Sequence, residues 1–258
     1  MDNINELMNE QTTAEQAVSD TPVKENIDIS LENMPDPFNM YNVTDASLLE
    51  KYNVRVYSKE EEIINFLTHA IGALLTLIGM FFLISKSNGQ FFLIVGAVLF
   101  SLTSFITFFV SALYHSLTDI RSRGIWRSID HATIGLMIAG CFVPIVLSQK
   151  FSLFNYLLLG VAVGMATYVA LLCVADLKKF KMLTFILQFV IGILGGILYL
   201  YNYKNFLPET RILYIVGGVV AAVGGLTYLI KTKYIHCVFH VIIMIASALF
   251  YAAIYYIY

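Results

Sequence analysis

The sequence predicts an all-α integral membrane protein, a bundle of seven transmembrane helices with its N-terminus in the cytoplasm and its C-terminus outside. Hydrophobic residues make up 58% of the 258 residues and charged residues only 13%, whereas soluble domains carry about 25% charged residues. Long apolar runs recur from residue 63 to the end of the sequence. Basic residues gather on one side of these runs. Together these observations favour a membrane bundle of defined orientation.

Residues 1–56 are predicted to form an acidic, disordered cytoplasmic tail, and residues 57–258 the membrane domain. Residues 1–50 hold eleven carboxylates and a single cation, Lys24. A polar, acidic segment with few aromatic residues cannot bury enough apolar surface to offset the entropy of ordering. The sequence identifies no partner for this tail.

Seven spans are expected in succession. They cover residues 63–85, 90–117, 127–148, 152–174, 182–201, 212–230 and 234–256. Each has about the 20 residues that a helix needs to cross roughly 30 Å of hydrocarbon. Short connections make consecutive helices antiparallel neighbours. Pro144 is expected to kink the third span, and the glycine-rich stretches 192–196 and 216–225 allow helices to approach closely.

The orientation follows from the lysines and arginines beside the spans. If the N-terminus is cytoplasmic, eleven of these cations flank the spans on the cytoplasmic side and four on the other side. The positive-inside rule therefore predicts a cytoplasmic N-terminus and an outside Tyr258.

All five histidines fall at the cytoplasmic ends of four predicted spans. They are His69 in the first span, His115 at the end of the second, His131 in the third, and His236 and His240 in the seventh. Ionisable residues inside membrane spans are costly and indicate function. The spacing of four residues puts His236 and His240 on one face of their helix.

This arrangement predicts a metal site with His115, His236 and His240 as ligands. Imidazole is a common zinc ligand, and three protein nitrogens with one open position are typical of catalytic zinc. Asp130, at the same depth, could hold or deprotonate a water activated by the metal. Ser111, one turn deeper than His115, could donate a hydrogen bond to a bound ligand.

Other polar residues are expected to contact these ligands rather than the metal. Glu62, Asn65 and His69 form one stripe on the first span. His131 directly follows Asp130, so the two side chains point about 100° apart on a helix.

Two further interpretations stay open for these residues. A histidine in a membrane span can simply hydrogen-bond a neighbouring helix, and polar residues gather at membrane interfaces because they are solvated there. Arg127 could pair with Glu62 or Asp130, or act only as an inside-positive anchor, which we favour.

Four motifs in order resemble the hemolysin III family, the bacterial branch of the progestin and adiponectin receptor superfamily. They are EEIINFLTHAIG, SALYHSL, RSIDHATIGLMIAGCFVP and HCVFH, within residues 57–258. The resemblance implies seven spans in a bacterial plasma membrane and zinc on the histidines matching His115, His236 and His240, with Asp130 and Ser111 nearby. Ala70 departs from the glycine expected in the first motif, and the acidic tail is longer than the family pattern.

Three functions are compatible with these observations. The first is a zinc-dependent hydrolase of lipid amides or esters acting in membrane lipid homeostasis. The second is the pore-forming cytolysin of the family name, although few polar residues lie in the outer halves of the spans. The third is a membrane sensor or receptor stabilised by a structural metal. The expected partner is membrane lipid, and no nucleic acid.

Overall fold

The computed structural model describes residues 49, 50, 52 and 54–258, which all belong to one compact unit, Phe38–Tyr258. The predicted acidic tail, residues 1–56, therefore lies largely outside the described residues. The described part contains helices and no strand. Its elements are α3 (Lys59–Lys86), α4 (Phe91–Ser116), α5 (Ile120–Gly140), α6 (Phe142–Ser148), α7 (Leu153–Asn202), the 3-10 turn η3 (Tyr203–Asn205), α8 (Pro208–Thr227) and α9 (Ile235–Tyr255).

Within the described residues, six helices are long and apolar enough to cross a membrane. They are α3, α4, α5 continued by α6, α7 continued by η3, α8, and α9. Many of their large apolar side chains point away from the bundle, as Phe81 and Phe91 do with about 70% of their surface exposed. An outward apolar surface of this kind is expected where lipid replaces water as the solvent.

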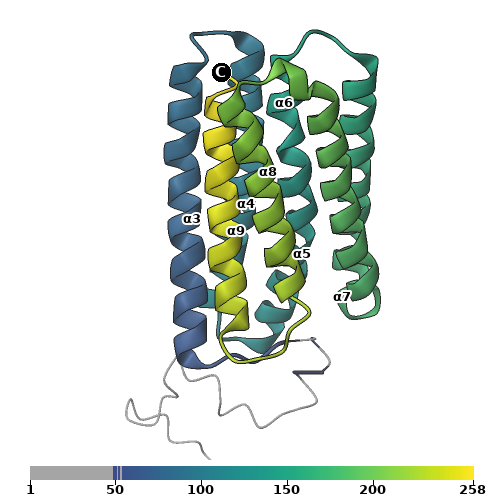
Figure 1. The fold of residues 1–258 in the computed structure, drawn as a ribbon. Coiled ribbons are helices and arrows are strands. Elements are labelled where there is room, and N and C mark those ends of the chain that lie inside the picture. The colour runs from purple at the N-terminus through teal and green to yellow at the C-terminus, as the bar shows by residue number, and fades with distance from the viewer. Residues whose placement is uncertain (1–48, 51, 53) are drawn as a thin grey trace, which may run out of the picture. The chain divides into compact units, whose positions relative to one another are not determined.

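The helix α7 is bent back on itself at Asp176. Asp176 has φ −164° and ψ 89°, outside the helical region, and Figure 1 shows the two arms of α7 running side by side from this bend. Oδ1 of Asp176 accepts a hydrogen bond of 2.9 Å from the amide of Lys179. This is the N-cap contact that starts a helix, so the second arm begins here. The two arms correspond to the predicted spans 152–174 and 182–201.

The predicted kink at Pro144 is confirmed. α5 ends at Gly140 and α6 begins at Phe142. Proline has no amide hydrogen to donate to the carbonyl four residues earlier, which belongs to Gly140. The hydroxyl of Tyr214 donates a 3.0 Å hydrogen bond to the nearby carbonyl of Cys141, so the break in the helix ties α8 to the third span.

The helices pack mainly in neighbouring pairs. α3 packs on α4 and α9, α5 packs on α7, and α8 packs on α9. Figure 1 shows α3 and α4, and likewise α8 and α9, close to antiparallel, whereas α3 and α9 run in the same direction. α5 and α7 approach tightly at Gly135, where a Cβ atom would lie 3.3 Å from Cα of Ala166.

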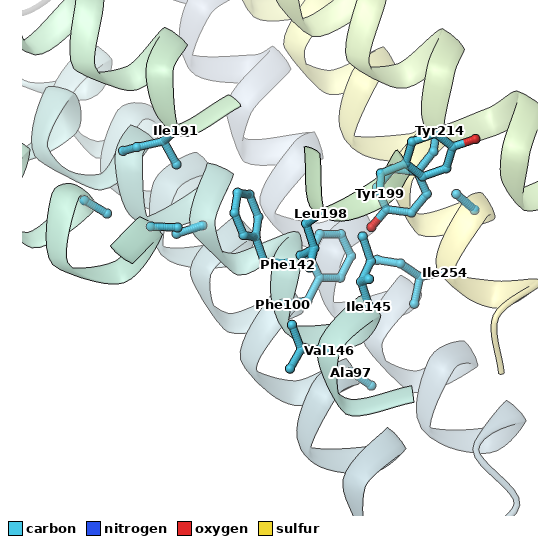
Figure 2. Close-up of a cluster of buried hydrophobic side chains, with 14 of the residues drawn as sticks. Ala97, Phe100, Phe142, Ile145, Val146, Ile191, Leu198, Tyr199, Tyr214 and Ile254 are labelled. Carbon is cyan, nitrogen blue, oxygen red and sulfur yellow. The ribbon is translucent and has the colours of Figure 1, made fainter. Parts of the chain in front are cut away.

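The apolar core runs along the bundle and includes the end where α6 is found. Figure 2 shows Phe142 and Ile145 of α6 beside Phe100 of α4, Leu198 of α7 and Ile254 of α9. Each of these side chains is at most 2% exposed. This end is opposite to the starts of α3, α5 and α9, where the histidines lie.

Candidate metal centre

Three imidazoles from two helices meet at the end of the bundle away from α6. His115 lies in the last turn of α4, and His236 and His240 lie in the first two turns of α9. Their ligand nitrogens all lie within 4.8 Å of one another. The two Nε2 atoms of His236 and His240 are 3.1 Å apart. Antiparallel α4 and α9 thus bring together residues more than one hundred positions apart.

This group has the geometry and chemistry of a metal site. Ligand nitrogens about 2.0–2.1 Å from a tetrahedral ion lie about 3.3 Å from one another, close to the separation between His236 and His240. Nε2 of His115 is buried and has no hydrogen-bond partner in the described part of the chain. A buried nitrogen without a partner is unfavourable unless something binds it. Imidazole suits zinc, copper, nickel and iron, so the donor set fits a metal and does not select zinc.

Glu62 orients His115. Nδ1 of His115 lies 2.6 Å from Oε2 of Glu62, and Arg123 donates to the other oxygen, Oε1. A carboxylate can only accept hydrogen bonds, so Nδ1 carries the proton. The cation of this pair is Arg123, which the sequence placed only among the inside-positive residues, and not Arg127.

His69 and Asn65 lie against the group of three. The rings of His69 and His240 stack with centroids 3.6 Å apart, and Phe108 meets His69 edge-on at 5.1 Å. Asn65 is fully buried. Its side-chain amide and both ring nitrogens of His69 have no hydrogen-bond partner among the described residues. His69 therefore contacts a candidate ligand and lies outside the group of three.

Asp130 and Ser111 line a cavity of about 600 Å³ that also reaches His236 and His240. The side chains of Ser111 on α4 and Asp130 on α5 interact with each other. Most of the remaining lining is apolar and comes from α5, α7, α8 and α9. A polar end and an apolar body are typical of a site for an amphiphilic molecule.

His131 lies outside the group of three. Its ring lies edge-on to Tyr228 with centroids 5.6 Å apart, and its carbonyl accepts a 3.2 Å hydrogen bond from Nε2 of Gln188. It lines the same cavity.

Sequence reasoning missed two contacts that hold the start of α9. Tyr57 stacks on His236 with ring centroids 4.8 Å apart, and burial raises the pKa of its hydroxyl well above the usual range. Oε1 of Glu61 accepts a 2.8 Å hydrogen bond from the amide of Tyr234. Ser58 and Glu61 have the spacing of a capping box, so the sequence could have placed Glu61 in the first turn of α3. No local pattern marks Tyr57.

Comparisons with known proteins agree with this architecture. A family model described as haemolysin-III related matches residues 57–251. A hemolysin-3 homolog of Bacillus subtilis (strain 168) is 27% identical over 205 residues, covering 78% of this chain and 96% of that protein. Hemolysin-3 of Bacillus cereus is 24% identical over 214 residues, covering 81% of this chain and 98% of that protein.

The matched region begins at Tyr57, beside the histidine group, and includes both arms of α7 and most of α9. It therefore contains all the helices that carry the candidate site. With its apolar helices and this match, the chain is a multi-pass membrane protein that belongs to the hemolysin III family.

Proposed function

We propose that this protein binds one zinc ion on His115, His236 and His240 near the cytoplasmic face of the plasma membrane and hydrolyses a lipid amide or ester, acting in membrane lipid homeostasis. The observation that carries the proposal is the meeting of three imidazoles, of which His115 and His240 are buried and His236 half-buried, beside a cavity lined by Asp130 and Ser111. In the same proposal, each arm of α7 crosses the bilayer. The protein then has seven spans, a cytoplasmic N-terminus and an outside C-terminus.

The cavity supports a lipid as the substrate. α8 packs mainly on α9 and α7 mainly on α5, and all four of these helices line the cavity. An acyl chain entering sideways between α7 and α8 would lie along apolar residues such as Phe185 and Ile243. Its polar head would meet the histidine end of the cavity.

The residues divide the chemistry between them. Bound zinc would supply Lewis-acid activation of water and of a carbonyl group. Asp130 would accept the proton of the attacking water, as a general base within reach of the substrate. Ser111, which interacts with Asp130, would hold that carboxylate in position or donate to the substrate carbonyl. Glu62 would hold His115 with Nε2 free.

Metal analysis and lipid hydrolysis on the full-length protein in detergent test both halves of the proposal. Purified wild type should hold about one zinc per chain, and the double variant His236→Ala/His240→Ala should hold none. His131→Ala should keep the metal, because that ring faces Tyr228. A fluorescent N-acyl lipid amide and its ester analogue report turnover.

The variants separate metal binding from catalysis. Asp130→Asn should keep zinc and release no fatty acid, because an amide cannot accept the proton. Wild type free of metal after a careful preparation would contradict the metal site. Zinc-loaded wild type without product on either lipid would contradict the hydrolase and favour a metal-stabilised sensor or receptor.

The name hemolysin, which the Bacillus cereus relative carries, raises pore formation as a second candidate. A pore through one chain needs a continuous polar lining. At the end of the bundle opposite to the histidines, the described core is instead filled by side chains such as Phe100 and Leu198. Dye release from liposomes by pure protein would support a pore formed by several chains, and intact liposomes at high protein-to-lipid ratio would reject it.

A further inference from the structure

We propose that Arg123 is a positioning residue for the metal site. Acting through Glu62, it holds the ring of His115 in the orientation and tautomer that present Nε2 to His236 and His240. This inference rests on the proposed metal site and adds to it a residue from a third helix, α5.

The two oxygens of Glu62 are divided between the two partners. Oε2 accepts from Nδ1 of His115 at 2.6 Å, and Oε1 accepts from a terminal nitrogen of Arg123. A neutral imidazole carries one hydrogen. With that hydrogen on Nδ1, the lone pair is on Nε2, the nitrogen that is buried without a partner in the described residues. The ion pair therefore fixes which nitrogen of His115 is available to a metal.

Arg123 is itself contacted from three sides, by Glu62, Leu117 and Tyr114. It is fully buried. Its second terminal nitrogen donates a 2.9 Å hydrogen bond to the carbonyl of Leu117, at the C-terminal end of α4, and its guanidinium carbon lies 4.8 Å from the centre of the Tyr114 ring. A cation at the C-terminal end of a helix is favourable. Arg123 thus links the start of α5 to the end of α4 and the start of α3.

A purely structural role of the Arg123–Glu62 pair would not explain why Glu62 also contacts His115. A buried ion pair adds little net stability, because desolvation offsets the attraction. A pair that only joined α3 to α5 would not need to share its carboxylate with a histidine of the metal group. Carboxylates that accept from the second nitrogen of a metal-bound histidine set ring orientation and basicity, and Arg123 prevents Glu62 from turning away.

Zinc affinity of the full-length protein, measured by competition with a fluorescent chelator, tests the inference. Arg123→Met should weaken zinc binding about 10- to 100-fold, the range for losing a group that orients a ligand. Arg121→Met is the matched control, because Arg121 lies on the same helix and is exposed to solvent, and it should bind zinc as wild type does. In a Glu62→Gln background, Arg123→Met should add little further loss, because Arg123 acts through Glu62.

The tautomer of His115 is a second readout. A merely structural role of Arg123 would leave this tautomer unchanged in the Arg123 variants. Nitrogen-15 NMR of histidine-labelled, metal-free protein should show the proton of His115 on Nδ1 in wild type and a mixture of tautomers in Arg123→Met. A His115→Ala variant assigns the signal. If Arg123→Met does not fold, Arg123→Lys replaces it. Lysine keeps the charge but cannot reach Glu62 and Leu117 together, so zinc affinity should still fall.

Each outcome decides a different question. Wild-type zinc affinity and an unchanged Nδ1 proton in the folded Arg123 variants would overturn the positioning role. Wild type that binds no zinc would overturn the proposed function. In that case the tautomer in metal-free protein still decides whether Arg123 and Glu62 orient His115.

Discussion

The two ends of the bundle bury opposite kinds of side chain on the same helices. α4 carries Phe100 near one end and His115 at the other, and both are nearly fully buried. Around Phe100 the core is mainly apolar, with buried hydroxyl groups such as those of Ser101 and Ser104. Around His115, the buried neighbours include the polar side chains of Glu62, Arg123 and His240 beside the rings of Tyr57 and Tyr114.

This difference indicates where stability and function reside. Apolar side chains packed at high density contribute dispersion contacts at little cost. Burying charges and imidazoles is costly, and their mutual contacts at best offset that cost. The apolar end therefore stabilises the bundle, and the histidine end is a costly arrangement, as expected if the proposed site exists to bind a metal.

The largest expected effect comes from breaking the apolar end. Phe100→Ala should lower the free energy of unfolding by about 3 to 5 kcal/mol, the usual cost of a cavity left by a buried phenylalanine, with the zinc content unchanged. Denaturant-induced unfolding in detergent measures the first quantity and metal analysis the second. Phe91→Ala is the control, because Phe91 on the same helix is 70% exposed. If Phe100→Ala lost zinc but kept its free energy of unfolding, the apolar end would serve metal binding rather than stability, the reverse of what we expect.

Removing the metal should remove only the stability that metal binding adds at the histidine end. At free zinc 100-fold above its dissociation constant, binding stabilises the folded state by about 2.7 kcal/mol, which a chelator should remove from wild type. The chelator should not lower the free energy of unfolding of His240→Ala. In Phe100→Ala it should lower this free energy as much as in wild type, because the effects of distant sites add independently. A chelator effect that vanished in Phe100→Ala would mean that the two ends are coupled.

Tyr57 tests whether a stacked aromatic ring contributes to metal binding at the histidine end. Tyr57→Leu removes the ring that stacks on His236, and should reduce the free energy of zinc binding by about 0.5 to 1.5 kcal/mol. Tyr57→Phe keeps the ring and should bind zinc as wild type does. Equal affinity in the leucine and phenylalanine variants would show that stacking does not hold His236.

The smallest effect is expected at Asp119, which caps the start of α5 by accepting a 2.7 Å hydrogen bond from the amide of Ser122. The hydrogen bonds from Ser122 lower the pKa of Asp119 in the folded state. A lowered folded pKa means that its stabilising contribution is present above the unfolded pKa of about 3.9 and is lost as the pH falls through the folded pKa.

Asp119→Asn tests this pH dependence, because asparagine keeps the cap and does not titrate. The unfolding temperature of wild type should exceed that of the variant slightly at pH 6, and the difference should disappear towards pH 3. A difference that is the same at both pH values would contradict the assignment.

Much of the fold was predictable because it depends on local properties of the chain. Run length and hydropathy set the helices, and the missing amide hydrogen of Pro144 set the break before α6. The bend of α7 at Asp176 was predictable as a polar connection at 175–181, but its reduction to one non-helical residue was not. That detail depends on an N-cap contact with Lys179 and on how the two arms pack.

The sequence by itself determined that the histidines gather at one end of the bundle, because helix rise and the alternating direction of consecutive helices set at which end each residue lies. It could not determine how each helix is rotated about its axis or which side chains of different helices contact one another. Arg123 and Arg127 are one turn apart and chemically identical, yet Arg123 pairs with Glu62. Only tertiary packing decided that pair, the stack of Tyr57 on His236 and the meeting of three imidazoles, because each joins side chains that no periodicity connects.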